Sequence, residues 1–330
     1  MPRAKTRPHP YDFDVFVARS PVFTLEELAA ARGDARQRSA ARNQLKRYLA
    51  TGRIKPVARE LYASVPPGMD PERFVPDPFL VAAAARPDGV FAYHSALELQ
   101  GAAHSVWHEC TLHCDQRRTA LRVGSSRILF LATPAAVVSR RAQTVATREF
   151  PRSTRQLVAA GPERSLVEGL RQPHRVGGLD ELVESVRGLP LLDFRLLERV
   201  LEIYGEKMLW AAAGWFAERY AETWSTPAEF LDQCRRHRPR QNQYIVRDLG
   251  GGRLLKDWRL IVPAHLVEDG VTRAADQWGP SRVGGRRGTC RAWCPTRRSP
   301  GTAGSSRSLH RARRHAAETA ARIRQEESGS

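Results

Sequence analysis

The stretch TLEELAAARGDARQRSAARNQLKRYLATGRIKPVARELYASV, residues 24–65, decides how the chain begins to fold. Thr24 and Glu27 have the spacing of a capping box, in which the threonine hydroxyl accepts from the Glu27 amide and the Glu27 carboxylate returns to the cap amide. This spacing predicts a helix that starts after Thr24. Gly33-Asp34 then predicts a turn before a second helical run over residues 36–50.

The second helical run has an apolar side and a polar side. Its apolar side is expected to be buried and consists of Ala41, Leu45, Tyr48 and Leu49. The opposite side projects Ser39, Arg42, Asn43, Lys46 and Arg47. Cations of this kind seek phosphates, and an amide can read a base edge in the major groove.

A wing is expected directly after this helix. Gly52 ends the helical run, and residues 53–65 read as two short strands joined by a tight connection at Arg59-Glu60. Phe13, Phe16 and Val17 predict an additional first helix over residues 11–19, which Ser20-Pro21 breaks. Three helices followed by a hairpin make a winged helix-turn-helix, with the third helix as the recognition element.

The charge of the chain is concentrated in the same module. Residues 32–59 contain nine basic residues and one acid, Asp34, which gives a net charge of +8 over 28 residues. A charge run by itself usually marks a solvated helix face. Because this one coincides with a winged helix-turn-helix pattern, double-stranded DNA is the favoured partner. The residues expected to contact DNA are Arg36, Arg38, Ser39, Arg42, Asn43, Lys46 and Arg47 on the helix and Arg53, Lys55 and Arg59 on the wing.

The fold class expected for the whole chain is α+β. Residues 1–66 form the winged helix-turn-helix domain, residues 67–77 a Pro-rich linker, and residues 78–267 a larger mixed α/β domain whose C-terminal half is helical. Strand patterns in this domain predict a mixed sheet. A second capping box is expected at Ser95-Ala96-Leu97-Glu98.

Residues 268–330 form an Arg-rich tail of a different character. Residues 271–330 contain thirteen Arg, no Lys and four acids, and so contribute +9 to the net charge of +18. Our hypothesis is that a frameshift replaced the native C-terminus, and an unbroken alternative frame past His265 would support it. The alternative is a disordered basic extension.

No membrane segment is expected, because the chain lacks a run of 18 apolar residues and its basic N-terminus is not followed by an apolar signal core. A cytoplasmic location is the corresponding expectation. Trp210, Trp215, Phe216 and Tyr220 have core-like helical spacing and are expected to pack rather than to stack on bases.

A cluster of metal-capable side chains raises the alternative of a zinc site. The cluster consists of His108, Cys110, His113 and Cys114, with Cys290 and Cys294 as a further pair. Alternate side chains of a strand face opposite ways, and the Cys-x3-Cys spacing is looser than a zinc knuckle. Buried, reduced thiols are therefore favoured, and neither a metal nor a cofactor is expected.

Catalysis is not expected either. The chain contains no P-loop, dinucleotide fingerprint, Gly-x-Ser-x-Gly or His-Glu-x-x-His motif. The alternative is a metal-dependent nuclease guided by the winged helix. Its best candidate carboxylates are Glu109, Asp115 and Glu149.

The chain from Phe13 to Leu266 resembles the AbiEi antitoxins of bacterial abortive-infection, type IV toxin-antitoxin systems. The resemblance is carried by Gly52-Arg53-Ile54, Arg59-Glu60-Leu61-Tyr62, Ser95-Ala96-Leu97 with Gly101, Glu163-Arg164-Ser165-Leu166, Gly177-Gly178, Gly214-Trp215-Phe216, and Trp258 with Pro263. Glu60 stands where the family usually has Gly, and Glu168 where Asp is common.

The resemblance implies a protein that represses its own operon by binding promoter repeats and counteracts a nucleotidyltransferase-like toxin encoded beside it. A plain transcriptional regulator with an effector pocket in the larger domain, and without a toxin, is the other alternative.

Overall fold

The computed structural model describes residues 12–32, 38–116, 118–246 and 252–267. Arg36, the predicted tail 268–330 and its Cys290 and Cys294 lie outside these residues. All described residues belong to one compact unit.

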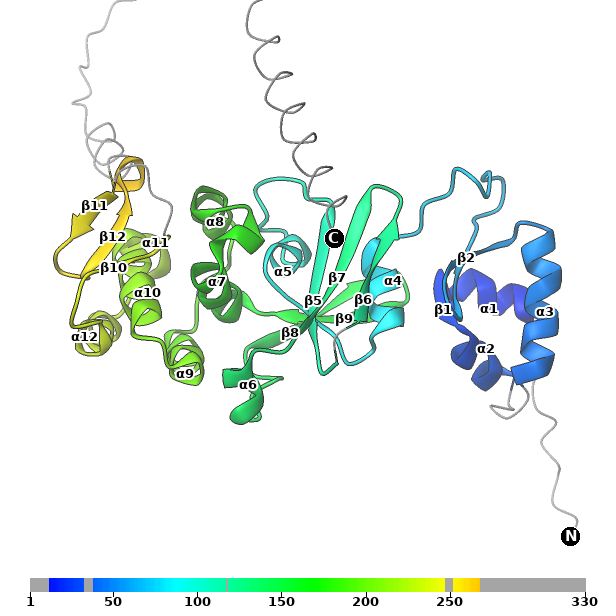
Figure 1. The fold of residues 1–330 in the computed structure, drawn as a ribbon, viewed down its shortest axis with the longest axis horizontal. Helices are drawn as coiled ribbons and strands as arrows, with labels where there is room; N and C mark the ends of the chain where they lie inside the picture. Colours follow the sequence, from blue (N-terminus) through cyan, green and yellow to red (C-terminus); the bar gives the residue numbers. More distant parts are fainter. Residues whose placement is uncertain (1–11, 33–37, 117, 247–251, 268–330) are drawn as a thin grey trace, which may run out of the picture. The chain divides into compact units, whose positions relative to one another are not determined.

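The chain begins with the predicted winged helix-turn-helix (Figure 1). Its elements are α1 (Phe13–Arg19), β1 (Val22–Thr24), α2 (Leu25–Ala31), α3 (Arg38–Ala50), β2 (Ile54–Ala58) and β3 (Leu61–Ser64). The three strands form an antiparallel sheet in the order β1-β3-β2. Strand β1 was not predicted, because a three-residue strand is defined by its partner β3 rather than by its own pattern.

The capping box at the start of α2 is confirmed. The Glu27 amide donates to Thr24 Oγ1 at 3.1 Å, and the Thr24 amide donates to Glu27 Oε2 at 2.7 Å. The helix then buries Leu25 and Leu28 in the small core of the module. Helix α1 closes this core through Phe13, whose ring stacks on Tyr48 of α3 at 3.9 Å between centroids.

Glu60 forms the tip of the wing. Its φ of +57° lies in the left-handed region, which glycine adopts without a Cβ penalty. The position at which the resemblance implies Gly therefore has the backbone conformation that favours Gly. The Glu60 carbonyl accepts from the amide of Leu25 at 2.9 Å, so the wing tip is tied to the start of α2.

The larger domain is built on a six-stranded mixed sheet of order β6-β7-β5-β4-β9-β8 (Figure 1). The strands are β4 (Val90–Phe91), β5 (Glu109–Cys114), β6 (Arg118–Val123), β7 (Ser126–Ala132), β8 (Thr147–Arg152) and β9 (Arg155–Ala160). Strand β5 is parallel to β7 and β4 is parallel to β9, whereas the other neighbours are antiparallel. The mixed sheet is thus as predicted.

The winged module and the larger domain share packing. Helix α4 (Pro78–Ala85) starts at its N-cap Asp77, and its Phe79 belongs to one hydrophobic cluster with Val22 and Leu61 of the winged module. Arg155 adds polar contacts to this packing. Its guanidinium donates to Glu27 Oε1 at 2.6 Å and to the Val22 carbonyl at 3.0 Å.

The predicted capping box at Ser95 is wrong. Helix α5 (His94–Leu99) has Tyr93 as its N-cap, without a side-chain cap bond. The Ser95 hydroxyl instead accepts from the Thr111 amide at 2.8 Å, which ties α5 to β5. A helical Ser can hydrogen-bond either a cap amide or a neighbouring strand, and only the tertiary packing decides between them.

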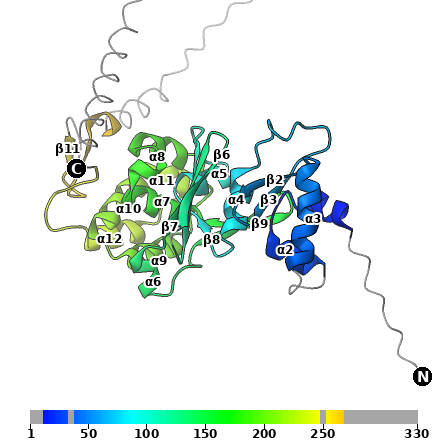
Figure 2. The ribbon, with the colours of Figure 1, turned by 45° about the vertical axis from the view of Figure 1, so that its right-hand side comes forward.

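The second half of the larger domain is helical, as predicted (Figure 2). A short helix, α6 (Ala135–Ser139), precedes it between β7 and β8. The elements of the helical half are α7 (Pro162–Arg171), a 3-10 turn (Pro173–Val176), α8 (Leu179–Val186), α9 (Phe194–Tyr204), α10 (Lys207–Arg219), α11 (Ala221–Trp224) and α12 (Ala228–His237). A small sheet follows, with β10 (Gln243–Tyr244), β11 (Gly252–Leu255) and β12 (Leu260–Pro263) in the order β10-β12-β11.

Helix α7 is the centre of this domain. It contacts α5, α8, α9, α10 and β9, and residues 162–170 are all buried. Trp210, Trp215 and Phe216 of α10 are also buried, as their spacing predicts. No helix within the described ranges is both long enough and apolar enough to span a membrane.

Candidate nucleic-acid interface

The exposed side of α3 is the candidate interface. Ala41 and Leu45 are 0% and 2% exposed and anchor the helix in the core. Residues three and four apart share a helix face, so the polar residues collect on the opposite side. These exposed residues are Ser39, Arg42, Asn43, Lys46 and Arg47. The structure therefore brings together five of the ten residues predicted to contact DNA.

These five side chains differ in how they are engaged. Arg42 Nη2 donates to Glu60 Oε1 at 2.8 Å, so the helix face meets the wing tip and part of its charge is balanced. Asn43, Lys46 and Arg47 form no side-chain hydrogen bond or ion pair with any described residue. Their donors and the amide oxygen are available to a ligand.

Two of the predicted wing cations have partners within the protein. The Arg53 guanidinium pairs with Asp14 at 2.7 Å and lies over the Tyr48 ring, 5.3 Å from its centroid. Lys55 Nζ donates to the carbonyl oxygens of Phe74 at 3.1 Å and Glu72 at 3.3 Å. Lys55 is thus held by backbone oxygens, whereas the Arg53 side chain is paired and remains 47% exposed.

The remaining predicted residues are only partly placed. Arg59 is exposed in the turn that follows β2. Arg38 is the first residue of α3, but its side chain is not among those that the structure describes. The exposed residues of the candidate interface are thus the α3 face with Arg53 and Arg59.

The candidate zinc ligands are distributed over both faces of β5. Cys110 and Cys114 point into one hydrophobic cluster, while the buried His113 lies on the other face and His108 is exposed. Burial raises the pKa of the Cys110 thiol. Within the described ranges, no three His, Cys, Asp or Glu side chains form a group that could hold a metal ion.

The candidate nuclease carboxylates are also separated. Glu109 begins β5, Asp115 follows its last residue, and Glu149 lies on β8 at the edge of the sheet. Glu109 and Asp115 lie at opposite ends of β5, and Glu149 lies on an edge strand, so the three carboxylates cannot bind one metal ion. No observation therefore favours the nuclease interpretation.

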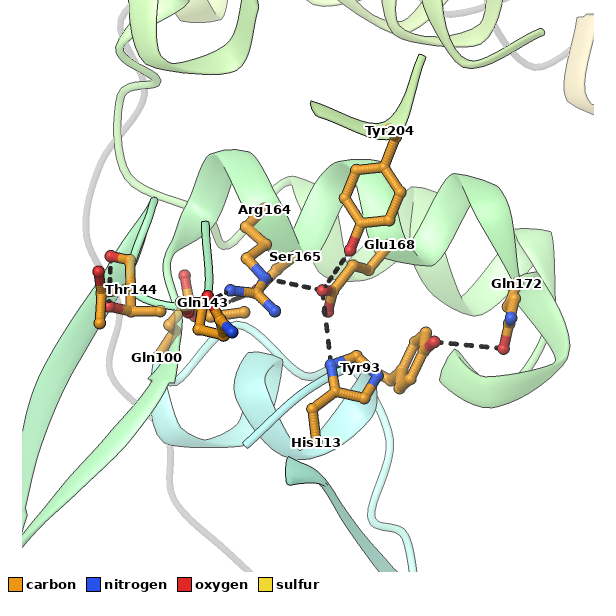
Figure 3. A network of polar contacts seen from close by, with 12 residues as sticks. Tyr93, Gln100, His113, Gln143, Thr144, Arg164, Ser165, Glu168, Gln172 and Tyr204 are labelled. Carbon is orange, nitrogen blue, oxygen red and sulfur yellow. Dashed lines mark hydrogen bonds and ion pairs between the residues drawn. The ribbon is translucent and has the colours of Figure 1, made fainter. Parts of the chain in front are cut away.

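A buried polar network, which the sequence pattern does not predict, lies between the sheet and the helices (Figure 3). Glu168 Oε1 accepts from Arg164 Nε and from the Tyr204 hydroxyl, each at 2.7 Å. His113 Nδ1 lies 3.7 Å from the same oxygen. The available signal was Arg164 and Glu168 at a spacing of four on the apolar helix α7.

The protonation states of this network follow from burial and pairing. Burial alone would raise the pKa of Glu168, but the charge of Arg164 and the two hydrogen bonds outweigh it, so this pKa lies below its ordinary value. Burial lowers the pKa of His113, which is therefore neutral at neutral pH. The network contains one compensated charge pair beside a neutral imidazole.

Comparison with known proteins yields similarity to solved structures alone. No family model matches the chain, and no curated protein matches it. Among solved structures, the chain is similar to the crystal structure of the RV2827C protein from Mycobacterium tuberculosis, with 18% sequence identity, a TM-score of 0.49, and coverage of 82% of this chain and 98% of that chain. A likeness at this identity and score does not bear on function.

Proposed function

We propose that the protein binds double-stranded DNA through α3 and acts as a transcriptional repressor. The observation that carries the proposal is the exposed side of α3, on which Asn43, Lys46 and Arg47 have no partner among the described residues. In a winged helix-turn-helix, this helix enters the major groove. Lys46 and Arg47 would then bind phosphates or guanine edges, and Asn43 would bind an adenine edge.

The resemblance to the AbiEi antitoxins extends this proposal. In that role the protein binds repeats in its own promoter, in the cytoplasm, and counteracts a nucleotidyltransferase-like toxin encoded beside it. The support is the order of the motifs along the sequence, together with a winged helix that precedes a larger α/β domain. A regulator without a toxin would use the same helix face.

DNA binding is tested by titrating the full chain into a labelled fragment from upstream of its gene and into a scrambled fragment, at several salt concentrations. We expect Lys46→Ala to weaken binding to both fragments and to lower the salt slope by about one. Asn43→Ala should cost ~1–3 kcal/mol at one base position of the upstream fragment and little on the scrambled one.

The matched control is Lys207→Ala, because Lys207 is an exposed helical lysine in the larger domain. Lys55→Ala serves as a second control, since its ammonium is held by carbonyl oxygens of the protein. Equal affinities of the Lys46→Ala and Lys207→Ala variants would contradict binding through α3.

The antitoxin role is tested by expressing the neighbouring open reading frame with and without this chain. We expect a nucleotidyltransferase-like product that arrests growth alone and is tolerated when the chain is present. Repression of a promoter reporter without any rescue of growth would leave the plain regulator as the function.

A further inference from the structure

A polar cavity of about 230 Å³ opens at one end of the six-stranded sheet. It is lined by Asp88, Val90, His113, Asp115, Thr133, Gln143 and Arg164. His113 and Asp115 lie at the carboxyl end of β5, and Thr133 follows the carboxyl end of its parallel neighbour β7. This edge is where open α/β sheets commonly bind ligands.

One side of the cavity is acidic. The Asp115 amide donates to Asp88 Oδ2 at 3.1 Å, so the two carboxylates are neighbours. Asp88 is compensated by Arg86, whose Nε donates to Asp88 Oδ1 at 2.7 Å and whose Nη2 pairs with the other carboxylate oxygen. The Asp115 carboxylate has no ion pair with any described residue. It is the acid available to a bound cation.

The other side of the cavity carries hydrogen-bond donors. The Arg164 side chain is 3% exposed; its Nε donates to Glu168 and its Nη1 to the Gln143 carbonyl at 2.8 Å (Figure 3). A guanidinium has five N–H donors, so donors remain beyond these two bonds. The Thr133 hydroxyl adds a further polar group to the lining.

His113 adds a buried polar side chain to the lining of the cavity. Its side chain is 2% exposed, and its Nδ1 makes no hydrogen bond but lies 3.7 Å from Glu168 Oε1. The cavity thus borders the buried polar network of Figure 3.

We propose that this cavity binds a small zwitterion of the α-amino acid type, with its ammonium group at Asp115 and its carboxylate at Arg164 and Thr133. The Asp115 carboxylate matches an ammonium group, and the remaining N–H donors of Arg164 with the Thr133 hydroxyl match a carboxylate, so a zwitterion matches both sets of groups. One water needs about 10–15 Å³ of cavity space, so the cavity is large enough for a molecule much bigger than water. The site does not depend on DNA binding.

The test uses the full chain, without DNA, in thermal-shift and calorimetric titrations against the common L-amino acids. Propionate and ethylamine serve as probes that carry only one of the two charges. We expect at least one L-amino acid to bind and to raise the unfolding temperature, and both single-charge probes to bind at least tenfold more weakly.

Asp115→Asn should lower the affinity for the amino acid at least tenfold, because it removes the charge beside the ammonium group and keeps the shape of the side chain. Thr133→Val should also lower this affinity, because it removes the hydroxyl that binds the carboxylate of the amino acid. The matched control is Asp232→Asn, at an exposed carboxylate on α12, and it should leave the affinity unchanged. Propionate or ethylamine binding as tightly as the amino acid, no amino acid binding, or an unaffected Asp115→Asn variant would each overturn the proposal.

Discussion

Removal of Glu168 alone should destabilise the protein more than removal of Glu168 together with Arg164. In Glu168→Leu, Arg164 would keep its charge in a site where its side chain is 3% exposed, and the Tyr204 hydroxyl would lose its acceptor. Breaking a buried ion pair by removing one partner costs about 3–5 kcal/mol, and an unpaired buried hydroxyl about 1–3 kcal/mol. We therefore expect a loss on the order of 5 kcal/mol for this variant.

The double variant Arg164→Met/Glu168→Leu removes the unpaired charge and leaves the Tyr204 hydroxyl without its acceptor and the Gln143 carbonyl without its donor. Its loss should be smaller, so the double-mutant cycle should give a coupling of roughly 2–4 kcal/mol in favour of the pair.

Urea titrations of the four proteins at one pH measure these free energies. Tryptophan fluorescence is a suitable signal because Trp210, Trp215 and Trp258 are buried in the same hydrophobic cluster as α7. The matched control is Glu184→Leu. Glu184 pairs with Arg187 at 2.5 Å on the surface of α8, and an exposed pair contributes about 0–1 kcal/mol. Additive losses in the cycle, or a Glu168→Leu loss no larger than that of Glu184→Leu, would refute the coupled network.

Two further outcomes are expected. Burial lowers the pKa of both His94 and His113 below the ordinary 6.5, so the unfolded chain binds their protons more readily than the folded chain does. Their contribution to stability is complete above pH 6.5 and is lost as the pH falls, by at most about 1.4 kcal/mol per pH unit for each proton. Urea midpoints between pH 7.5 and pH 5 check this, and constant or rising midpoints toward acid would contradict it. Thr24→Ala should cost about 1 kcal/mol because the cap of α2 is lost, whereas Thr24→Ser should retain most of the stability; equal losses would instead indicate packing of the methyl group.

Local signals in the sequence predicted much of the secondary structure. The capping box at Thr24 and the apolar stripe of α3 are both present. Such signals work because a cap or a helix face depends on residues within four positions of each other. The exposed α3 face could therefore be predicted residue by residue.

Other parts of the sites could not be predicted in this way. Arg53 and Lys55 carry the same charge as Lys46, yet Arg53 pairs with Asp14 and Lys55 donates to the carbonyl oxygens of residues 72 and 74. Ser95 fits a cap by spacing but bonds to a neighbouring strand. In each case the partner is distant along the chain, so the spacing of nearby residues contains no information about it.

The sequence alone determined a basic winged helix with a polar helix face, because helical periodicity places side chains on faces without reference to the rest of the fold. The tertiary structure decided which cations remain available, and it assembled the cavity from strand ends and the buried helix α7. The cavity forms only when strand pairing brings together residues that are as far apart in the sequence as Asp88 and Arg164. Pairing between distant segments depends on the burial of the whole sheet, so no single segment of the sequence predicts it.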